Sequence, residues 1–156
     1  MNWIVEPERK TPVMANVELL VCGGGFAGVS AAVCGARNGS EVLLLEKYGF
    51  LGGLVTSALV ITTPPLNNGI NSEIAKRLRE KAVYAPCRHS GEEVEWLNMH
   101  AMDPEVIKYE FLQMLQENKI DFLLHTYIVG TLMEGQRIKG ILMENKAGRQ
   151  AILAKM

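Results

Sequence analysis

The sequence predicts an α/β fold in which a parallel sheet is followed by an antiparallel meander. Two observations predict it. An apolar strand, a glycine-rich turn, a helix of small residues and a second apolar strand follow one another between Val17 and Glu46. Three short strands with tight turns between them come after residue 126. Strands that alternate with helices build parallel sheets, whereas strands joined by short turns pair antiparallel.

Composition indicates one globular domain. Of the 156 residues, 48% are hydrophobic and 21% are charged, which is enough apolar material for a core. The net charge is −1 without a lysine or arginine cluster, so we expect no nucleic-acid partner. We expect residues 1–16 to be an irregular leader, because Pro7 and Pro12 oppose regular structure, and residues 17–156 to be the domain.

No targeting or membrane segment is expected. The first ten residues lack the apolar stretch of a secretion signal, so we expect a cytoplasmic protein. Residues 19–36 carry no charge and approach the length of a membrane span, but three consecutive glycines interrupt them. A strand followed by a helix explains this stretch better than a span does.

The glycine-rich turn predicts a binding site for an adenine dinucleotide. Gly23 permits the tight turn out of the strand, and Gly25 lets a phosphate approach the backbone. Gly28 lets the following helix pack close to the sheet. That helix begins near Phe26, and its free N–H groups and positive dipole end would hold the phosphates.

An acidic residue completes this unit. Glu46 ends the predicted strand 41–45, at the place where a carboxylate accepts the hydroxyls of the adenosine ribose. The same carboxylate would repel a 2′-phosphate, which argues against NADP. The unit by itself fits FAD and NAD equally.

A long uncharged loop follows. Residues 48–71 contain no charged residue and several glycines and prolines, so they are too interrupted for a long helix. Such a loop suits a buried flat ring system. The alternative is a loop that only packs under another part of the domain.

The remaining elements follow from capping and periodicity. Asn71 or Ser72 caps a helix that runs to about Ala82, and residues 83–102 look irregular. Asp103 and Pro104 start a helix that runs to about residue 118. A buried strand over 120–125 and three meander strands over 127–133, 137–144 and 150–154 complete the prediction.

The cysteines and histidines predict no metal site, because no ligand spacing is present. Cys22 and Cys34 fall on strand and helix positions that we expect to be buried, whereas Cys87 is expected in an exposed loop. His100 is a candidate acid or base, although a structural or exposed role is the more ordinary interpretation.

Four stretches together resemble the FAD-dependent oxidoreductases of the glutathione-reductase-like, Rossmann-like class. They are Cys22–Ala32 with Gly39, Leu44–Gly53, Asp103–Tyr109 and Leu123–Val129. The sequence is similar to the flavin subunit of heterodisulfide reductases and to fumarate reductase flavoproteins. The resemblance implies FAD as the cofactor and a small-molecule redox substrate. It is also compatible with a redox partner protein.

The predicted cofactor contacts combine the glycine pattern with this resemblance. The backbone at Ile128 corresponds to the family's adenine contact, and Thr56 and Ser57 are the nearest candidates for flavin contacts. The full set is Gly23, Gly25, Phe26, Ala27, Gly28, Glu46, Lys47, Gly52, Gly53, Leu54, Thr56, Ser57 and Ile128. No catalytic residue can be named.

The end of the sequence departs from the family pattern. Family members continue into an Ala-Thr-Gly-Asp-Gly motif that completes the flavin site, whereas this sequence stops at Met156. We therefore expect the FAD-binding portion of a flavin-dependent oxidoreductase, C-terminally truncated, which binds FAD weakly and is inactive alone. An NAD-binding dehydrogenase domain and a split-gene fragment that only binds nucleotide remain as alternatives.

Overall fold

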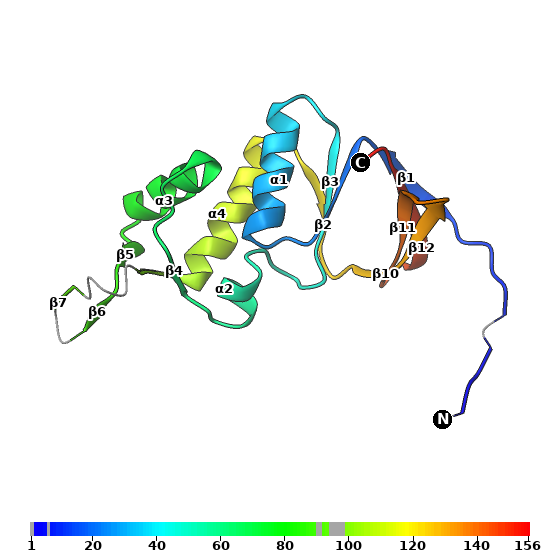
Figure 1. The fold of residues 1–156 in the computed structure, drawn as a ribbon, viewed down its shortest axis with the longest axis horizontal. Helices are drawn as coiled ribbons and strands as arrows, with labels where there is room; N and C mark the ends of the chain where they lie inside the picture. The colour runs from blue at the N-terminus through cyan, green and yellow to red at the C-terminus, as the bar shows by residue number, and fades with distance from the viewer. Residues whose placement is uncertain (1, 6, 90–91, 94–98) are drawn as a thin grey trace.

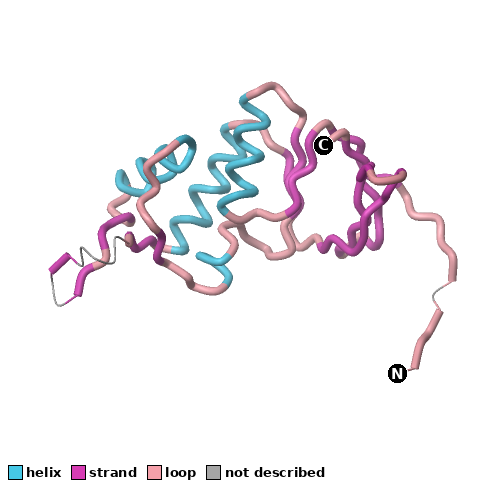
Figure 2. Tube along the Cα trace, in the orientation of Figure 1, coloured by secondary structure: helices cyan, strands magenta, loops and turns pink. Residues whose placement is uncertain are grey.

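A central parallel sheet separates a layer of helices from an antiparallel sheet (Figures 1 and 2). The structure, a computed structural model, describes residues 2–5, 7–89, 92–93 and 99–156. Strands β2 (Leu19–Cys22), β3 (Val42–Leu45) and β9 (Asp121–Leu123) form the parallel sheet in the order β2-β3-β9. Helix α1 (Phe26–Arg37) joins β2 to β3, and α4 (Pro104–Glu117) precedes β9. The strand–helix–strand unit is confirmed.

The meander is confirmed as well. Strands β10 (Tyr127–Glu134), β11 (Arg137–Asn145) and β12 (Gly148–Ala154) pair antiparallel in sequence order.

The prediction of an irregular leader up to residue 16 was wrong for its last four residues. Strand β1 (Val13–Val17) pairs parallel with β12 and brings Val17 opposite Ala154. Pro12 lies just before this strand, and its carbonyl accepts from the Ala151 amide at 2.8 Å, so the missing N–H of proline does not interrupt the pairing.

The core has two parts because β3 alternates between the two faces of the sheet. Val42 and Leu44 face the helices and pack with buried residues of α1 and α4, such as Val29 and Phe111. Leu43 and Leu45 belong to the other part, which packs against the meander. All four strand residues are buried, as expected for a parallel strand covered on both faces.

A third, small antiparallel sheet extends beyond the helices. It consists of β4 (Thr62–Thr63), β8 (His100–Met102) and β5 (Tyr84–Pro86), in the order β4-β8-β5. Strands β6 (Arg88–His89) and β7 (Glu92–Glu93) pair beside it. Residues 83–102 were predicted to be irregular. That prediction was wrong for the described strands, which are too short to show alternation in the sequence.

Two further helices follow β3 in the chain, one before β4 and one between β4 and β5. Helix α2 (Leu54–Ser57) is a single turn inside the uncharged loop. Helix α3 (Gly69–Glu80) has Asn68 as its N-cap, three residues before Asn71 and four before Ser72, the two predicted caps. Within the described residues, none of the helices combines the length and apolar character of a membrane span.

The prediction for the cysteines was wrong. Cys22 and Cys34 are exposed, and Cys87 is half-buried. Val21 packs toward the helices, so its neighbour Cys22 points to the opposite side of β2, where it lines an open groove. Cys34 lies one residue beyond the buried pair Ala32 and Val33 of α1, on the face turned away from the core.

Candidate functional site

The first turn of α1 lies so close to the turn after β2 that position 28 admits only glycine. Gly23 has φ +116°, a backbone conformation that L side chains rarely adopt. A Cβ atom added at Gly28 would lie 1.8 Å from the carbonyl oxygen of Gly23. Because that oxygen belongs to the backbone, no side-chain rotation relieves the clash. The first turn of α1 therefore rests directly on the end of β2.

The N-terminus of α1 has no side-chain cap. Its N-cap is Gly25, which offers no acceptor, and its first turn contains no acidic residue. The Gly25 carbonyl begins the helix by accepting from the Val29 amide at 2.9 Å. The first amides of the helix are thus without a side-chain acceptor at its positive dipole end, which is the arrangement that binds an anion.

A second glycine loop packs against the first. The Gly52 amide donates to the Gly24 carbonyl at 2.8 Å. Gly53 has φ +58°, and a Cβ atom added there would lie 2.9 Å from the Gly25 Cα. The two loops thus meet backbone to backbone, at a separation that a side chain on Gly53 would increase.

The Glu46 carboxylate connects the first loop to the segment after β3. It is 6% exposed. Its Oε2 accepts from the Gly24 amide at 2.6 Å, and its Oε1 accepts from the Tyr48 amide at 2.9 Å. A carboxylate offers about four lone-pair positions, so two remain for further donors.

A pocket of about 480 Å³ opens at the N-terminus of α1. Six of the predicted contacts line it: Gly25, Phe26, Ala27, Gly52, Gly53 and Leu54. Its other walls come from residues that the sequence did not single out: Val55, Val60, Thr62, Thr63 and Met102. None of these eleven residues is ionisable, so the pocket suits an uncharged, largely apolar group.

The remaining predicted contacts lie outside that pocket. Gly23, Gly28 and Glu46 build the cradle beside it, as described above. The buried Thr56 hydroxyl donates to the Leu51 carbonyl at 2.8 Å, and the Ser57 hydroxyl donates to the Gly53 carbonyl at 2.6 Å. Both hydroxyls therefore hold their own loop. The exposed Lys47 ammonium lies 4.7 Å from the centre of the Tyr48 ring.

Ile128 lies away from the pocket. Together with Leu20 and Cys22 of β2, it lines a separate groove of about 400 Å³ between the parallel sheet and the meander. The structure therefore gathers six of the predicted residues around one pocket, with Gly23, Gly28 and Glu46 beside it, whereas Ile128 lines the other groove.

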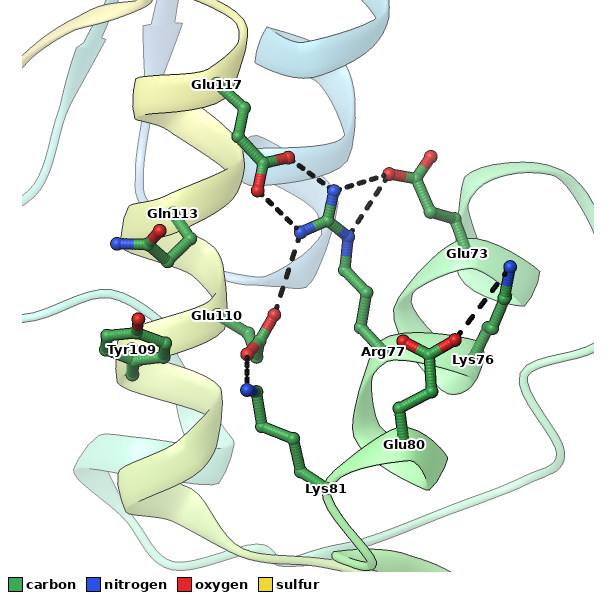
Figure 3. A pocket seen from close by; sticks show the side chains of 9 residues that line it. All are labelled: Glu73, Lys76, Arg77, Glu80, Lys81, Tyr109, Glu110, Gln113 and Glu117. Atoms are coloured by element: carbon green, nitrogen blue, oxygen red, sulfur yellow. Dashed lines mark hydrogen bonds and ion pairs between the residues drawn. The ribbon is translucent and has the colours of Figure 1, made fainter.

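A charged hollow of about 500 Å³ between α3 and α4 has a different character (Figure 3). Arg77 donates to Glu73 and Glu117 and lies 3.7 Å from the buried Glu110 carboxylate. Lys81 lies 3.3 Å from the other oxygen of Glu110. These carboxylates and cationic side chains pair with one another, so the cluster links α3 to α4. Because its charges are balanced from within, it is a weaker candidate for a ligand site than the pocket at the start of α1.

The same ion pairs shift the ionisation of the cluster. The hydrogen bond that Glu117 accepts from Arg77 holds the pKa of Glu117 below its ordinary value of 4.5. The pKa of Glu73 is lowered mainly by Arg37, whose guanidinium donates to it at 2.6 Å, and secondarily by Arg77.

The fold and the cradle define a dinucleotide-binding α/β protein. Residues 18–156 match the family described as FAD dependent oxidoreductase, so the chain belongs to that family. The match confirms the predicted family and its cofactor FAD, and it decides against the NAD alternative. The chain is the FAD-binding portion of a flavin-dependent oxidoreductase.

Known proteins show the same likeness. The chain is 32% identical over 94 residues to a bifunctional thioredoxin reductase/thioredoxin of Mycobacterium leprae, a match that covers 60% of this chain and 20% of that protein. A geranylgeranyl bacteriochlorophyll reductase-like protein of Thermoplasma acidophilum superposes with a TM-score of 0.67 at 18% identity, over 91% of this chain and 38% of the other.

A flavocytochrome c3 fumarate reductase superposes with a TM-score of 0.61 at 17% identity, over 91% of this chain and 33% of the other. At these identities the two structures show a shared fold. The chain thus spans between a fifth and two fifths of the proteins that it matches here.

Proposed function

We propose that FAD lies across the cradle, with its pyrophosphate at the N-terminus of α1, its adenosine ribose at Glu46 and its flavin ring in the pocket lined by Gly53 and Met102. The uncapped N-terminus of α1, opening into an uncharged pocket, is the observation that carries this placement. The pyrophosphate needs donors without a competing acid, and the ring needs an apolar slot; the two requirements are met side by side.

In this placement, different residues of the chain contact the phosphates and the flavin ring. The amides at the start of α1 orient the phosphates, while Val60, Thr62 and Met102 form the far wall and exclude water from the ring. FAD supplies the electron-carrying chemistry, and the protein supplies binding and orientation. Thr62 and Thr63 are the polar side chains of this wall that could hydrogen-bond to the ring edge.

The chain acts within a longer oxidoreductase in this proposal. The matched proteins extend well beyond the part that this chain covers, so the groups that contact the redox substrate come from elsewhere in such a protein. We propose a cytoplasmic enzyme that transfers electrons or hydride to or from a small molecule, with a redox partner protein as a further electron donor or acceptor.

The substitution Ala27→Asp tests the phosphate site without destabilising the helix. An acid in the first turn is favourable to the helix dipole, but it repels a pyrophosphate held by the adjacent amides. We expect the Kd for FAD, measured by quenching of flavin fluorescence, to rise at least about tenfold while the Tm without FAD does not fall.

The control is Ala31→Asp, which places the same charge on an exposed position one turn further along α1. It should change the Kd for FAD much less. Equal effects of the two variants, or an FAD affinity that Ala27→Asp leaves unchanged, would place the phosphates elsewhere.

A further inference from the structure

The buried carboxylate of Glu46 has hydrogen-bond partners within the protein itself. One of its oxygens accepts from the amide of Gly24, which lies 22 residues earlier in the chain. The other accepts from the amide of Tyr48, two residues later. Receiving ribose hydroxyls does not by itself require these two amide bonds, so they point to a second role. We propose that Glu46 is a positioning residue, which closes the dinucleotide cradle before the cofactor binds.

Main-chain bonds of the same residue extend this role. The Glu46 amide donates to the Leu123 carbonyl at 2.9 Å, and its carbonyl accepts from the Thr126 amide at 2.9 Å. Glu46 therefore fixes the end of β3 against the segment between β9 and β10, while its side chain reaches across to the glycine turn after β2. One residue joins three segments that are far apart in the sequence.

The link continues into the ring pocket. Gly24 donates its amide to Glu46 and accepts with its carbonyl from Gly52, whose neighbour Gly53 lies against Gly25. Gly24 is buried, and an added Cβ would also approach Leu51 Cδ2 to 2.5 Å. Releasing the carboxylate would thus free the turn whose carbonyl holds the second glycine loop in place.

Two consequences follow for the cofactor, and both rest on the proposed function. The Gly24 amide is committed to Glu46, so the phosphate donors begin at Gly25 and continue into α1. The carboxylate keeps two unused lone-pair positions, so it can accept ribose hydroxyls without leaving the cradle. Charge-assisted bonds to buried amides are strong, and their loss leaves an unsatisfied donor in the interior.

Amide hydrogen exchange on the FAD-free chain tests the proposal directly. In Glu46→Gln the side-chain NH2 group must face one of the two amides, so at least one bond is lost whichever way the group turns. We expect the amide of Gly24 or Tyr48 to exchange at least about tenfold faster, while the amide of Leu44 in β3 keeps its protection. Glu41→Gln removes a carboxylate from the exposed start of the same segment and should change neither.

A second variant keeps the charge and shortens the reach. Glu46→Asp should retain the local bond to Tyr48 and lose the bond to Gly24, so the Gly24 amide should exchange faster and the Tyr48 amide should not. This variant decides the matter if Glu46→Gln fails to fold. Unchanged protection of Gly24 in both variants, together with weaker FAD binding, would show a ribose contact alone and overturn the positioning role.

The proposed function fails in a different way. If the chain loses Gly24 protection in these variants but its affinity for FAD is unaffected, Glu46 does hold the cradle closed, and the proposed placement of FAD is wrong. The exchange measurement needs no cofactor, so the two results are independent.

Discussion

The cradle at the start of α1 and the ion-pair cluster between α3 and α4 hold chain segments together by opposite means. In the cradle, main-chain atoms meet directly, with the Gly28 position against the Gly23 carbonyl and Gly53 against Gly25. In the cluster, long side chains bridge two helices, and the Arg77 guanidinium forms ion pairs with three carboxylates. At Gly28 and Gly53 the cradle therefore has no room for a Cβ atom, whereas the cluster can lose one partner and keep others.

The largest effect is expected where an added methyl group meets backbone. Gly28→Ala places a Cβ atom 1.8 Å from the Gly23 oxygen. We expect the free energy of unfolding to fall by about 3 kcal/mol, measured by urea denaturation, because α1 must move off the sheet. Gly130→Ala is the matched control, since its Cβ would meet Leu142 Cδ1 at 3.4 Å; a change within about 1 kcal/mol is expected there.

Next in size is the contact between the two glycine loops. Gly53 and Gly135 both have a positive φ, of 58° and 60°, but Gly53 combines it with a ψ of −127°, and Gly135 has nothing within 4 Å of an added Cβ. Gly135→Ala should cost only the conformational strain, about 1 kcal/mol. Gly53→Ala should cost about 2 to 3 kcal/mol and weaken FAD binding about tenfold, because it also pushes the loops apart. Equal costs for the two variants would show that the close contact contributes nothing.

Removing the central charge of the cluster should have a smaller effect. Arg77→Met leaves Glu110 with Lys81 and Glu73 with Arg37, so we expect a loss of about 1 to 2 kcal/mol in urea denaturation. Lys76→Met, which removes an exposed pair at 3.9 Å, should cost less than about 0.5 kcal/mol. FAD affinity should stay the same in both variants, and a loss of affinity in Arg77→Met would break the separation between the two regions.

The smallest effect is a dependence on pH. Arg77 and Arg37 hold the pKa values of Glu117 and Glu73 below 4.5 in the folded protein. A lowered folded pKa contributes stability above about pH 4.5, and this contribution is lost as the pH falls through the folded value. The difference in unfolding free energy between the wild type and Arg77→Met should therefore be larger at about pH 6 than at about pH 3. A difference that stays constant would mean that packing, not charge, carries the Arg77 contribution.

The two regions also differ in how much the sequence reveals. The first loop of the cradle is local in sequence, because Gly28 meets the carbonyl of the nearby Gly23. The glycine spacing and the flanking apolar runs together predict its strand, turn and helix. The cluster brings Arg77 to Glu117, 40 residues away, and no spacing rule connects them. Such pairs follow from the packing of α3 on α4, which the periodicity of neither helix specifies.

The errors have the same origin. Strand β1 was missed because its partner is the last strand of the chain, and the wall formed by Thr62, Thr63 and Met102 was missed because it depends on two- and three-residue strands. Cys22 was expected to be buried because apolar strands usually are, but its side of β2 faces the open groove. The ribose-binding role proposed for Glu46 follows from its place in the motif, whereas its bond to Gly24 required the three-dimensional arrangement.

The contact between Gly28 and Gly23 has a consequence for the gene as well as for the protein. Every amino acid other than glycine carries a Cβ atom, and the backbone oxygen 1.8 Å from that position cannot turn away as a side chain can. Each missense change in the Gly28 codon should therefore be disabling, and silent changes alone should survive selection. A saturation library of this codon, sorted for folded chains that bind FAD and read by sequencing, would show an almost invariant position, whereas the codon of the exposed Ala31 would tolerate many more changes.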